Sequence, residues 1–241
     1  IRVPNLIVHG ETGRYPLYVN GIIRSVRYWL RILRMESWRH PHMMYIKLFN
    51  SSQQNWANKI KEILCKYNFE DVWVAQNVHH ESVFLKDLKQ RIIHDYIGKW
   101  EQALRGSERF SFYRSIKLVW GREMYLYALD IKPFRDVFVQ FRAGFSELYC
   151  HRLRYSGENE ENLFVCPSCR EEYENEYHLV YSCPVYEDLR KKYVYNIRDI
   201  NRVDKLFSEC DSWGVRNIAM FLYHVFKRRR EAVDVVYADL Y

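Results

Sequence analysis

The chain contains few of the residues that interrupt regular structure, with 9 glycines and 6 prolines among 241 residues. It has no low-complexity tract and no Gly/Ser-rich linker, and 48% of its residues are hydrophobic, so the composition does not favour a largely disordered protein. Its apolar runs are short and interrupted by arginine, lysine or glutamate, which argues against a membrane-spanning helix and a membrane partner. The length is sufficient to bury the core of one large domain or of two small ones.

Motifs for common enzymatic chemistry are lacking as well. The sequence has no glycine-rich phosphate loop, no nucleophile elbow around a serine and no HExxH metalloprotease motif. We therefore expect a protein without catalytic activity of its own. The first residue is Ile1 rather than methionine, from which we expect either a piece of a longer polypeptide or a trimmed chain.

Cysteine is sparse and unevenly placed. Three of the 6 cysteines fall within one short segment, whereas Cys65, Cys150 and Cys210 are widely scattered. This distribution favours a reducing compartment and a single metal site over a disulfide scaffold. We expect an intracellular protein, located in the nucleus, the cytoplasm or both.

Basic residues are in excess. The formal net charge is +7 and the isoelectric point is about 9.0. Such an excess favours a polyanionic partner, although many basic proteins bind nothing acidic. The positions of the charges therefore matter more than their sum.

Hydrophobic residues recur with helical periodicity through most of the chain. Between residues 21 and 35, four of them share one face: Ile23, Val26, Leu30 and Leu33. The same pattern predicts further helices, at 55–67, 82–104, 184–193 and 212–230. Strand signals are weak, so we expect a mainly α-helical protein.

The segment CPSCREEYENEYHLVYSC, residues 166–183, has three cysteines and one histidine at the spacing C-x2-C-x8-H-x4-C. Structural zinc sites take four nitrogen or sulfur ligands in a tetrahedron, and two residues between the first thiolates permit a tight turn. Three thiolates and one imidazole suit Zn2+, whereas an iron–sulfur cluster more often has four cysteines. The predicted zinc ligands are Cys166, Cys169, His178 and Cys183.

The predicted zinc is structural, because four protein ligands leave no position open for water or substrate. The alternative is an accidental spacing within an ordinary core. His151, which follows Cys150, is expected to be structural or exposed rather than a metal ligand.

These features divide the chain into four expected parts. Residues 1–20 carry Pro4 and Pro16 and are expected to be a connector, with one short strand around residues 6–8. The other parts are a helical region at 21–156, a CCHC zinc-binding module at 157–195 and a C-terminal helical tail at 196–241. The acidic stretch GENEENLF, residues 157–164, is the best candidate for a linker. The expected fold class is mainly α, a helical domain with a small embedded CCHC zinc module.

Three groups of basic residues are candidates for nucleic-acid binding. The first lies along one face of the helix predicted at 21–35, beside Tyr28 and Trp29, and consists of Arg24, Arg27, Arg31 and Arg34. The second follows the cysteine motif and the third ends the last helix: Arg190, Lys191 and Lys192, then Lys227, Arg228, Arg229 and Arg230. The alternative for each group is a solvated helix face, or, for the third, charges that complement the helix dipole. Four glutamates between residues 171 and 176 would repel phosphate.

The cysteine motif and its flanks resemble the C-terminal region of non-LTR (LINE-type) retrotransposon reverse transcriptases. ERFSFYRSIK and FRDVFVQFRAGFSELYCHRLRY resemble the helical approach to the family's zinc-binding motif, and CPVYEDLRKKYV resembles its exit. VPNLIVHGETGRYPLYV and VRYWLRILRM resemble the stretch that follows the polymerase in animal elements. The resemblance covers most of the chain and carries the family's zinc-ligand role to the four motif residues.

This resemblance implies a region that binds element RNA or target DNA during target-primed reverse transcription, with the rest of the reverse transcriptase polypeptide as a partner. The family's polymerase needs a Tyr-x-Asp-Asp pair, but the tail VVYADLY, residues 235–241, has the single carboxylate Asp239. The endonuclease of some relatives needs a Pro-Asp dipeptide, which this chain lacks. We therefore expect neither activity. The alternatives are a zinc-stabilised scaffold that docks on the polymerase or on another protein, and an isolated nuclease.

Overall fold

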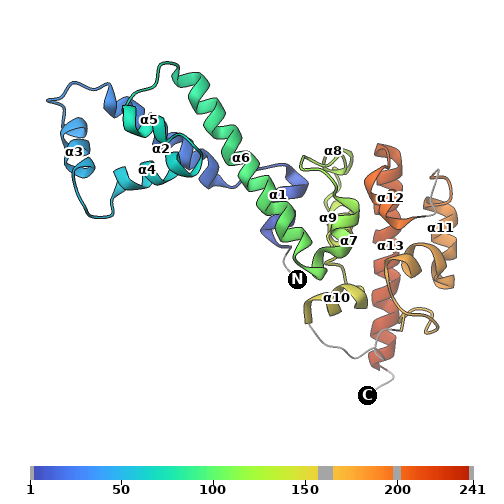
Figure 1. Cartoon of the computed structure of the whole chain (residues 1–241). Helices are drawn as coiled ribbons and strands as arrows, with labels where there is room; N and C mark the ends of the chain where they lie inside the picture. Colours follow the sequence, from blue (N-terminus) through green and yellow to red (C-terminus); the bar gives the residue numbers. More distant parts are fainter. Residues whose placement is uncertain (1–2, 157–164, 198–201, 239–241) are drawn as a thin grey trace. The chain divides into compact units, whose positions relative to one another are not determined.

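The computed structural model describes residues 3–156, 165–197 and 202–238 (Figure 1). All the secondary-structure elements among these residues are helices. The β-type pairings there are two isolated bridges, Thr12–Arg122 and Val165–Tyr173. The predicted mainly α fold is therefore confirmed. No helix in the described ranges is both long and apolar enough to cross a lipid bilayer.

The chain divides into two compact units. The small unit comprises residues 15–100, and the large unit comprises residues 1–14 together with 101–241. This division differs from the four expected parts, because the segment with the cysteine motif lies within the large unit rather than beside it. The predicted linker at 157–164 lies outside the described residues.

The small unit is a cluster of helices around aromatic side chains. Its helices are α2 (Leu17–Leu33), α3 (His40–Phe49), α4 (Trp56–Lys66), α5 (Glu70–Ala75) and the larger part of α6 (Glu81–Arg105). The Trp29 ring stacks on Trp73 at 5.8 Å between centroids, and its Nε1–H donates a hydrogen bond to the Tyr45 hydroxyl at 3.0 Å. Ile23 and Leu30, on the predicted inner face of α2, are buried as expected.

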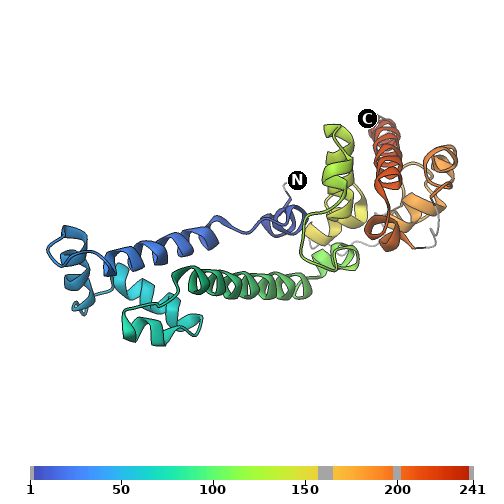
Figure 2. The same cartoon turned by 90° about the horizontal axis from the view of Figure 1, so that it is seen from above.

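The large unit is assembled around the last long helix. Its helices are α1 (Asn5–Thr12), α7 (Ser111–Ile116), α8 (Tyr125–Ala128), α9 (Lys132–Arg142), α10 (Tyr149–Ser156), α11 (Glu187–Tyr193), α12 (Val203–Ser208) and α13 (Ser212–Ala238). Figures 1 and 2 show α13 beside α9, and α13 also contacts α8 and α11. The core side chains of this unit include Phe141, Leu179, Tyr186 and Leu222.

The prediction of a short strand around residues 6–8 is wrong, because α1 occupies residues 5–12. The next helix, α2, begins at Leu17. Pro4 and Pro16 cap the N-termini of these two helices, where a missing N–H costs nothing. Gly13 ends α1 in the left-handed conformation, with φ of 64°. The prolines and glycine thus mark helix ends rather than an irregular segment.

A buried ionic network joins α1 to the rest of the large unit. Glu11 is 3% exposed, and its carboxylate accepts hydrogen bonds from Arg142 Nε at 3.1 Å and from the Tyr113 hydroxyl at 2.9 Å. Arg142 also contacts the carboxylate of Glu123 at 2.8 Å, and Glu123 pairs with Lys117. Burial and the adjacent Glu11 carboxylate raise the pKa of Tyr113, so its hydroxyl stays a hydrogen-bond donor. Removing one member would leave a buried charge without its partner.

Candidate metal centre and basic surfaces

A tight backbone turn carries the first two cysteines of the motif. The amide of Cys166 donates to the carbonyl of Glu172 at 2.8 Å, and the amide of Arg170 donates to the carbonyl of Cys166 at 2.8 Å. Arg170 adopts the left-handed conformation, with φ of 60°, which reverses the chain direction. The turn places Cys166 and Cys169 on the same side of the loop.

A single π-type turn carries the other two motif residues. It spans His178–Ser182 and is closed by a hydrogen bond of 2.8 Å from the Cys183 amide to the His178 carbonyl. The Asn175 side chain accepts a hydrogen bond from the His178 amide at 2.8 Å and so fixes the start of this turn. The x4 spacing of the motif is therefore one wide helical turn, which brings both ligand side chains to one side.

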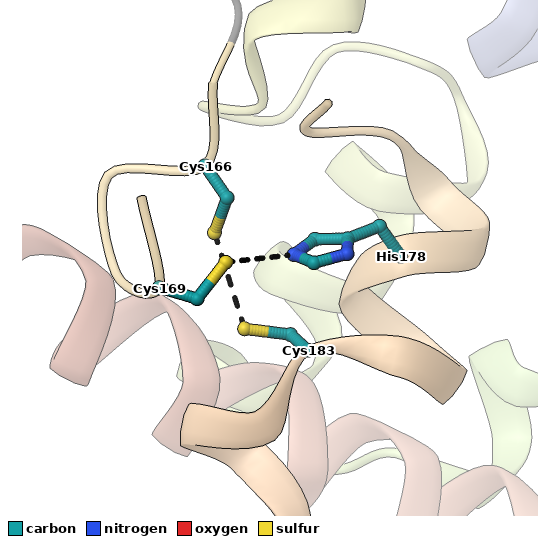
Figure 3. Close-up of side chains that lie close together, drawn as sticks. All are labelled: Cys166, Cys169, His178 and Cys183. Atoms are coloured by element: carbon teal, nitrogen blue, oxygen red, sulfur yellow. Dashed lines mark hydrogen bonds between the residues drawn. The ribbon is translucent and has the colours of Figure 1, made fainter. Parts of the chain in front are cut away.

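The four side chains converge on one point, as Figure 3 shows. The sulfurs of Cys166 and Cys183 are 3.9 Å apart, and Cys169 Sγ is 3.5 Å from His178 Nε2. A tetrahedral zinc site with bonds of about 2.3 Å to sulfur and about 2.0 Å to nitrogen has edges of roughly 3.8 Å and 3.5 Å. A disulfide would need sulfurs about 2.0 Å apart. The cluster can therefore hold a metal ion and contains no disulfide.

The cluster is shielded from water and favours a thiolate. Cys166, His178 and Cys183 are each at most 2% exposed. The Cys183 thiol and the backbone amides of Cys169 and Ser168 donate hydrogen bonds to Cys166, which lowers the pKa of that thiol to about 4. The hydrogen bond with Cys166, burial and the nearby Cys166 charge raise the pKa of Cys183. The two shifts are opposite ends of one interaction, and a bound cation would replace the shared proton.

Glu172 orients the histidine from behind. His178 directs Nε2 toward Cys169, and its Nδ1 lies 2.7 Å from the Glu172 carboxylate. The Nδ1–H therefore donates to Glu172, and Nε2 is left free to bind a metal. Histidines that bind metals commonly donate their second N–H to a carboxylate in this way. The sequence suggested only that this glutamate would repel phosphate.

Two further glutamates of the motif have partners inside the fold. Glu174 is fully buried and forms a bidentate pair with Arg229 of α13, at 2.6 and 2.8 Å. Glu176 accepts hydrogen bonds from His151 at 3.0 Å and from Arg154 at 2.6 Å. These carboxylates tie the segment with the cysteine motif to α10 and α13. No local pattern identifies the pairs, because Glu174 and Arg229 are 55 residues apart in sequence.

Cys150, His151 and Glu176 also come together in the core and are close enough to share a cation. The Ser146 hydroxyl lies 2.7 Å from His151 Nδ1, so both nitrogens of the imidazole are used. The Arg154 guanidinium already neutralises the Glu176 carboxylate and would repel a cation there. This arrangement is a buried hydrogen-bond network, in line with the expectation of a structural His151.

Most of the predicted basic residues of the large unit are used within the fold. Arg190 is 2% exposed and donates to the Cys183 carbonyl at 2.5 Å and to Glu187, which also lies 3.6 Å from Lys191. Arg228 pairs with Asp188 at 2.7 Å, and Arg230 lies 3.7 Å from Glu147. Of the seven candidate residues, Lys192 and Lys227 are the two whose side chains are exposed and have no carboxylate partner among the described residues.

The prediction that Arg190 and Arg229 bind nucleic acid is therefore wrong. Their guanidinium groups are buried and hydrogen-bonded within the large unit, so they present no surface to a phosphate. The other five of the seven candidate residues in this unit are exposed or half-buried, namely Lys191, Lys192, Lys227, Arg228 and Arg230.

The arginine row of α2 is exposed, in contrast to the buried Arg190 and Arg229. Arg24, Arg27 and Arg31 are exposed, and none forms an ion pair within the part of the chain that the structure describes. Arg34 contacts Glu81 at 2.5 Å. The row lines a groove of about 430 Å³, together with Tyr28 and Glu81. We call this hollow the α2 groove.

A second hollow shares part of this lining. Its volume is about 680 Å³, and its polar lining residues are Arg27, Arg34, His79, His80, Glu81 and Ser82. Trp29, which was expected beside the row, points into the core and is fully buried. Tyr28 is the aromatic residue that the α2 groove exposes.

Comparison with known proteins adds no assignment to these sites: no family model, curated protein or solved structure matches this chain.

Proposed function

We propose that this chain binds nucleic acid without catalysing a reaction on it. The small unit would hold phosphates along the α2 groove, and the large unit would be a zinc-stabilised helical scaffold. The observation that carries this proposal is the row formed by Arg24, Arg27 and Arg31, which are exposed, lie on one helix face and have no acidic partner among the described residues.

The spacing of this row suits a phosphate backbone. Arg31 follows Arg24 by seven positions, which corresponds to about 10 Å along a helix axis. Arginine can contact phosphate oxygens through two parallel N–H groups, and neutralising phosphates releases bound counterions. Glu81 is the one carboxylate that lines the groove, and Arg34 neutralises it.

The distribution of charge between the units supports the same proposal. Residues 15–100 contain 13 arginines and lysines against 7 acidic residues, whereas the rest of the chain contains 24 against 23. A net charge of +6 therefore belongs to the small unit and +1 to the large unit. A polyanion would be attracted mainly to the small unit.

Zn2+ is the metal that we propose for the Cys/His cluster. Its three thiolates and one imidazole match the preference of zinc, and the separations between the ligand atoms match a tetrahedron. Cys166, Cys169, His178 and Cys183 would be its ligands. With four protein ligands the ion would act as a cross-link between two turns, and it would leave no position for a reacting water.

The resemblance to non-LTR retrotransposon reverse transcriptases gives this proposal a biological setting. The chain would be the region that follows the polymerase and would contact element RNA or target DNA during target-primed reverse transcription. The convergence of the four motif residues and the helical character of their flanks support this assignment.

A docking scaffold is the second candidate, and one observation favours it for the large unit. Five of the seven predicted basic residues there have a carboxylate within 4 Å. Such a surface offers little attraction to phosphate. We therefore assign nucleic-acid binding to the small unit, and attachment to the rest of a longer polypeptide to the large unit.

The test measures binding of the full chain to fluorescein-labelled single-stranded and duplex oligonucleotides by anisotropy at several salt concentrations. Replacing Arg24, Arg27 and Arg31 by glutamine should weaken binding at least tenfold. It should also reduce the slope of log K against log salt by about 0.7–0.9 for each phosphate that is no longer neutralised. A matched control removes three exposed lysines of the same unit that lie outside the groove, namely Lys47, Lys59 and Lys61. Equally weakened binding by the two variants, or no binding by the wild type, would contradict the proposed function.

A further inference from the structure

An exposed tyrosine lies within the arginine row. Tyr28 follows Arg24 by four residues and precedes Arg31 by three, so all three side chains lie on the same face of α2. The Tyr28 side chain lines the α2 groove and is 49% exposed. An aromatic face is thus flanked along the helix by guanidinium groups that have no acidic partner in the described ranges.

The ring is supported by a neighbouring helix. Trp56 opens α4, and its ring centroid lies 5.9 Å from that of Tyr28, with the planes tilted by 57°. The Asn55 side chain caps α4 by accepting hydrogen bonds from the amides of Ala57 and Asn58 at 2.8 and 3.2 Å. Tyr28 therefore has a fixed ring partner, while about half of its surface is exposed and its side chain lines the α2 groove.

This combination distinguishes between classes of nucleic acid. In a duplex the faces of the bases are covered by their neighbours in the stack, and a protein reaches only phosphates, sugars and base edges. In a single strand a base can turn outward and stack on an aromatic ring while arginines hold the phosphates on either side. An arginine row alone serves both classes, but an exposed tyrosine between the arginines adds contact only to unpaired bases.

We propose that the α2 groove binds single-stranded nucleic acid, with one unpaired base stacked on Tyr28 and the flanking phosphates held by Arg24, Arg27 and Arg31. This inference rests on the proposed function and specifies its ligand class. The groove volume of about 430 Å³ suits one base with its sugar and phosphate. The second hollow shares Arg27 and Arg34 with the groove and gives the strand a basic continuation toward the start of α6.

The residues that line the two hollows do not distinguish DNA from RNA. The stacking face and the guanidinium groups recognise features that both polymers have. We therefore expect single-stranded DNA and RNA of one sequence to bind with affinities within a few-fold of each other.

The experiment uses the full chain and three labelled probes of one sequence, each of about 12 nucleotides: single-stranded DNA, single-stranded RNA and duplex DNA. The wild type should bind both single strands more tightly than the duplex. Tyr28→Ala should weaken single-strand binding by about 5- to 150-fold, the range typical when one stacked base loses its aromatic partner, and should leave duplex binding within about twofold. Tyr28→Phe keeps the ring and should bind single strands within about twofold of the wild type.

Tyr18→Ala is the matched control. Tyr18 lies on the same helix, is also 49% exposed and is outside the lining of the α2 groove. The Tyr18→Ala variant should bind every probe as the wild type does, and melting curves should show that each variant is folded. If Tyr28→Ala retains single-strand binding while the triple arginine variant loses it, the inference is wrong and the proposed function stands. If the arginine variant also binds normally, the proposed function fails.

Discussion

Replacing Arg229 by methionine should destabilise the large unit strongly, because this arginine neutralises a fully buried carboxylate. The side chains of Arg229 and Glu174 are 2% and 0% exposed and are joined by hydrogen bonds of 2.6 and 2.8 Å. Without the guanidinium, Glu174 keeps only the amide of Tyr149 as a donor among the described residues, at 2.8 Å. Removing one partner of a buried ion pair typically costs about 3–5 kcal/mol.

The assay is urea denaturation followed by circular dichroism. With an m-value of about 2 kcal/mol/M, a loss of about 4 kcal/mol lowers the midpoint by about 2 M. The control is the adjacent residue, since Arg230 is 54% exposed and lies 3.7 Å from Glu147. Arg230→Met should change the free energy of unfolding by less than about 0.5 kcal/mol.

A double variant separates loss of charge balance from loss of packing. Arg229→Met combined with Glu174→Gln leaves no buried charge at this pair, and the glutamine carbonyl can still accept from the Tyr149 amide. It should recover most of the stability that Arg229→Met loses. If Arg229→Met were as stable as the wild type and bound nucleic acid more weakly, Arg229 would be a surface phosphate contact and the structural reasoning would be refuted.

Three further predictions concern the metal centre and the small unit. Mass spectrometry should find one zinc per wild-type chain and none in Cys169→Ser, which should also melt at a lower temperature; a zinc-free wild type would overturn the assignment. Glu172→Gln should weaken zinc affinity at least about tenfold in chelator competition, because Glu172 orients the imidazole of His178. The control Glu171→Gln, at the exposed neighbouring residue, should not change the affinity. Equal affinities of the two variants would show that the contact between Glu172 and His178 does not contribute to zinc binding. Hydrogen bonds from Lys66, Lys99 and Tyr67 lower the pKa of Asp95 from its ordinary value of 3.8 to about 2. The ionised Asp95 carboxylate therefore stabilises the fold above about pH 4, and this contribution is lost as the pH falls toward 2. Asp95→Asn should flatten the stability profile in that window, and an unchanged slope would count against the interaction.

The local parts of the fold could be predicted from sequence because their causes are local. The apolar face of α2 follows from a period of 3.6 residues, and Val26 and Leu30 are buried as that period requires. The convergence of Cys166, Cys169, His178 and Cys183 could be predicted because a tight turn and one π-type turn each bring two of these side chains together within a few residues. Short-range hydrogen bonds determine both results.

The long-range parts could not be predicted in the same way. Arg24 and Arg229 are both arginines in basic runs, and nothing within a few residues of either shows which one meets a carboxylate. Glu174 lies 55 residues from Arg229, and Glu11 lies 131 residues from Arg142. The helix at residues 5–12 was missed for a related reason, since its buried Glu11 is stabilised by partners far along the chain.

Arginine side chains have different environments in the two units. In the large unit, Arg154, Arg190 and Arg229 each hold the segment with the cysteine motif against a helix, and each has a carboxylate partner inside the fold. A cross-link of two short turns by a metal ion would reinforce the same segment. In the small unit, aromatic packing around Trp29 supplies the core, and three arginines of α2 face no carboxylate among the described residues. Loss of the metal should therefore unfold the large unit first, and the charge of the α2 groove should be unaffected by it.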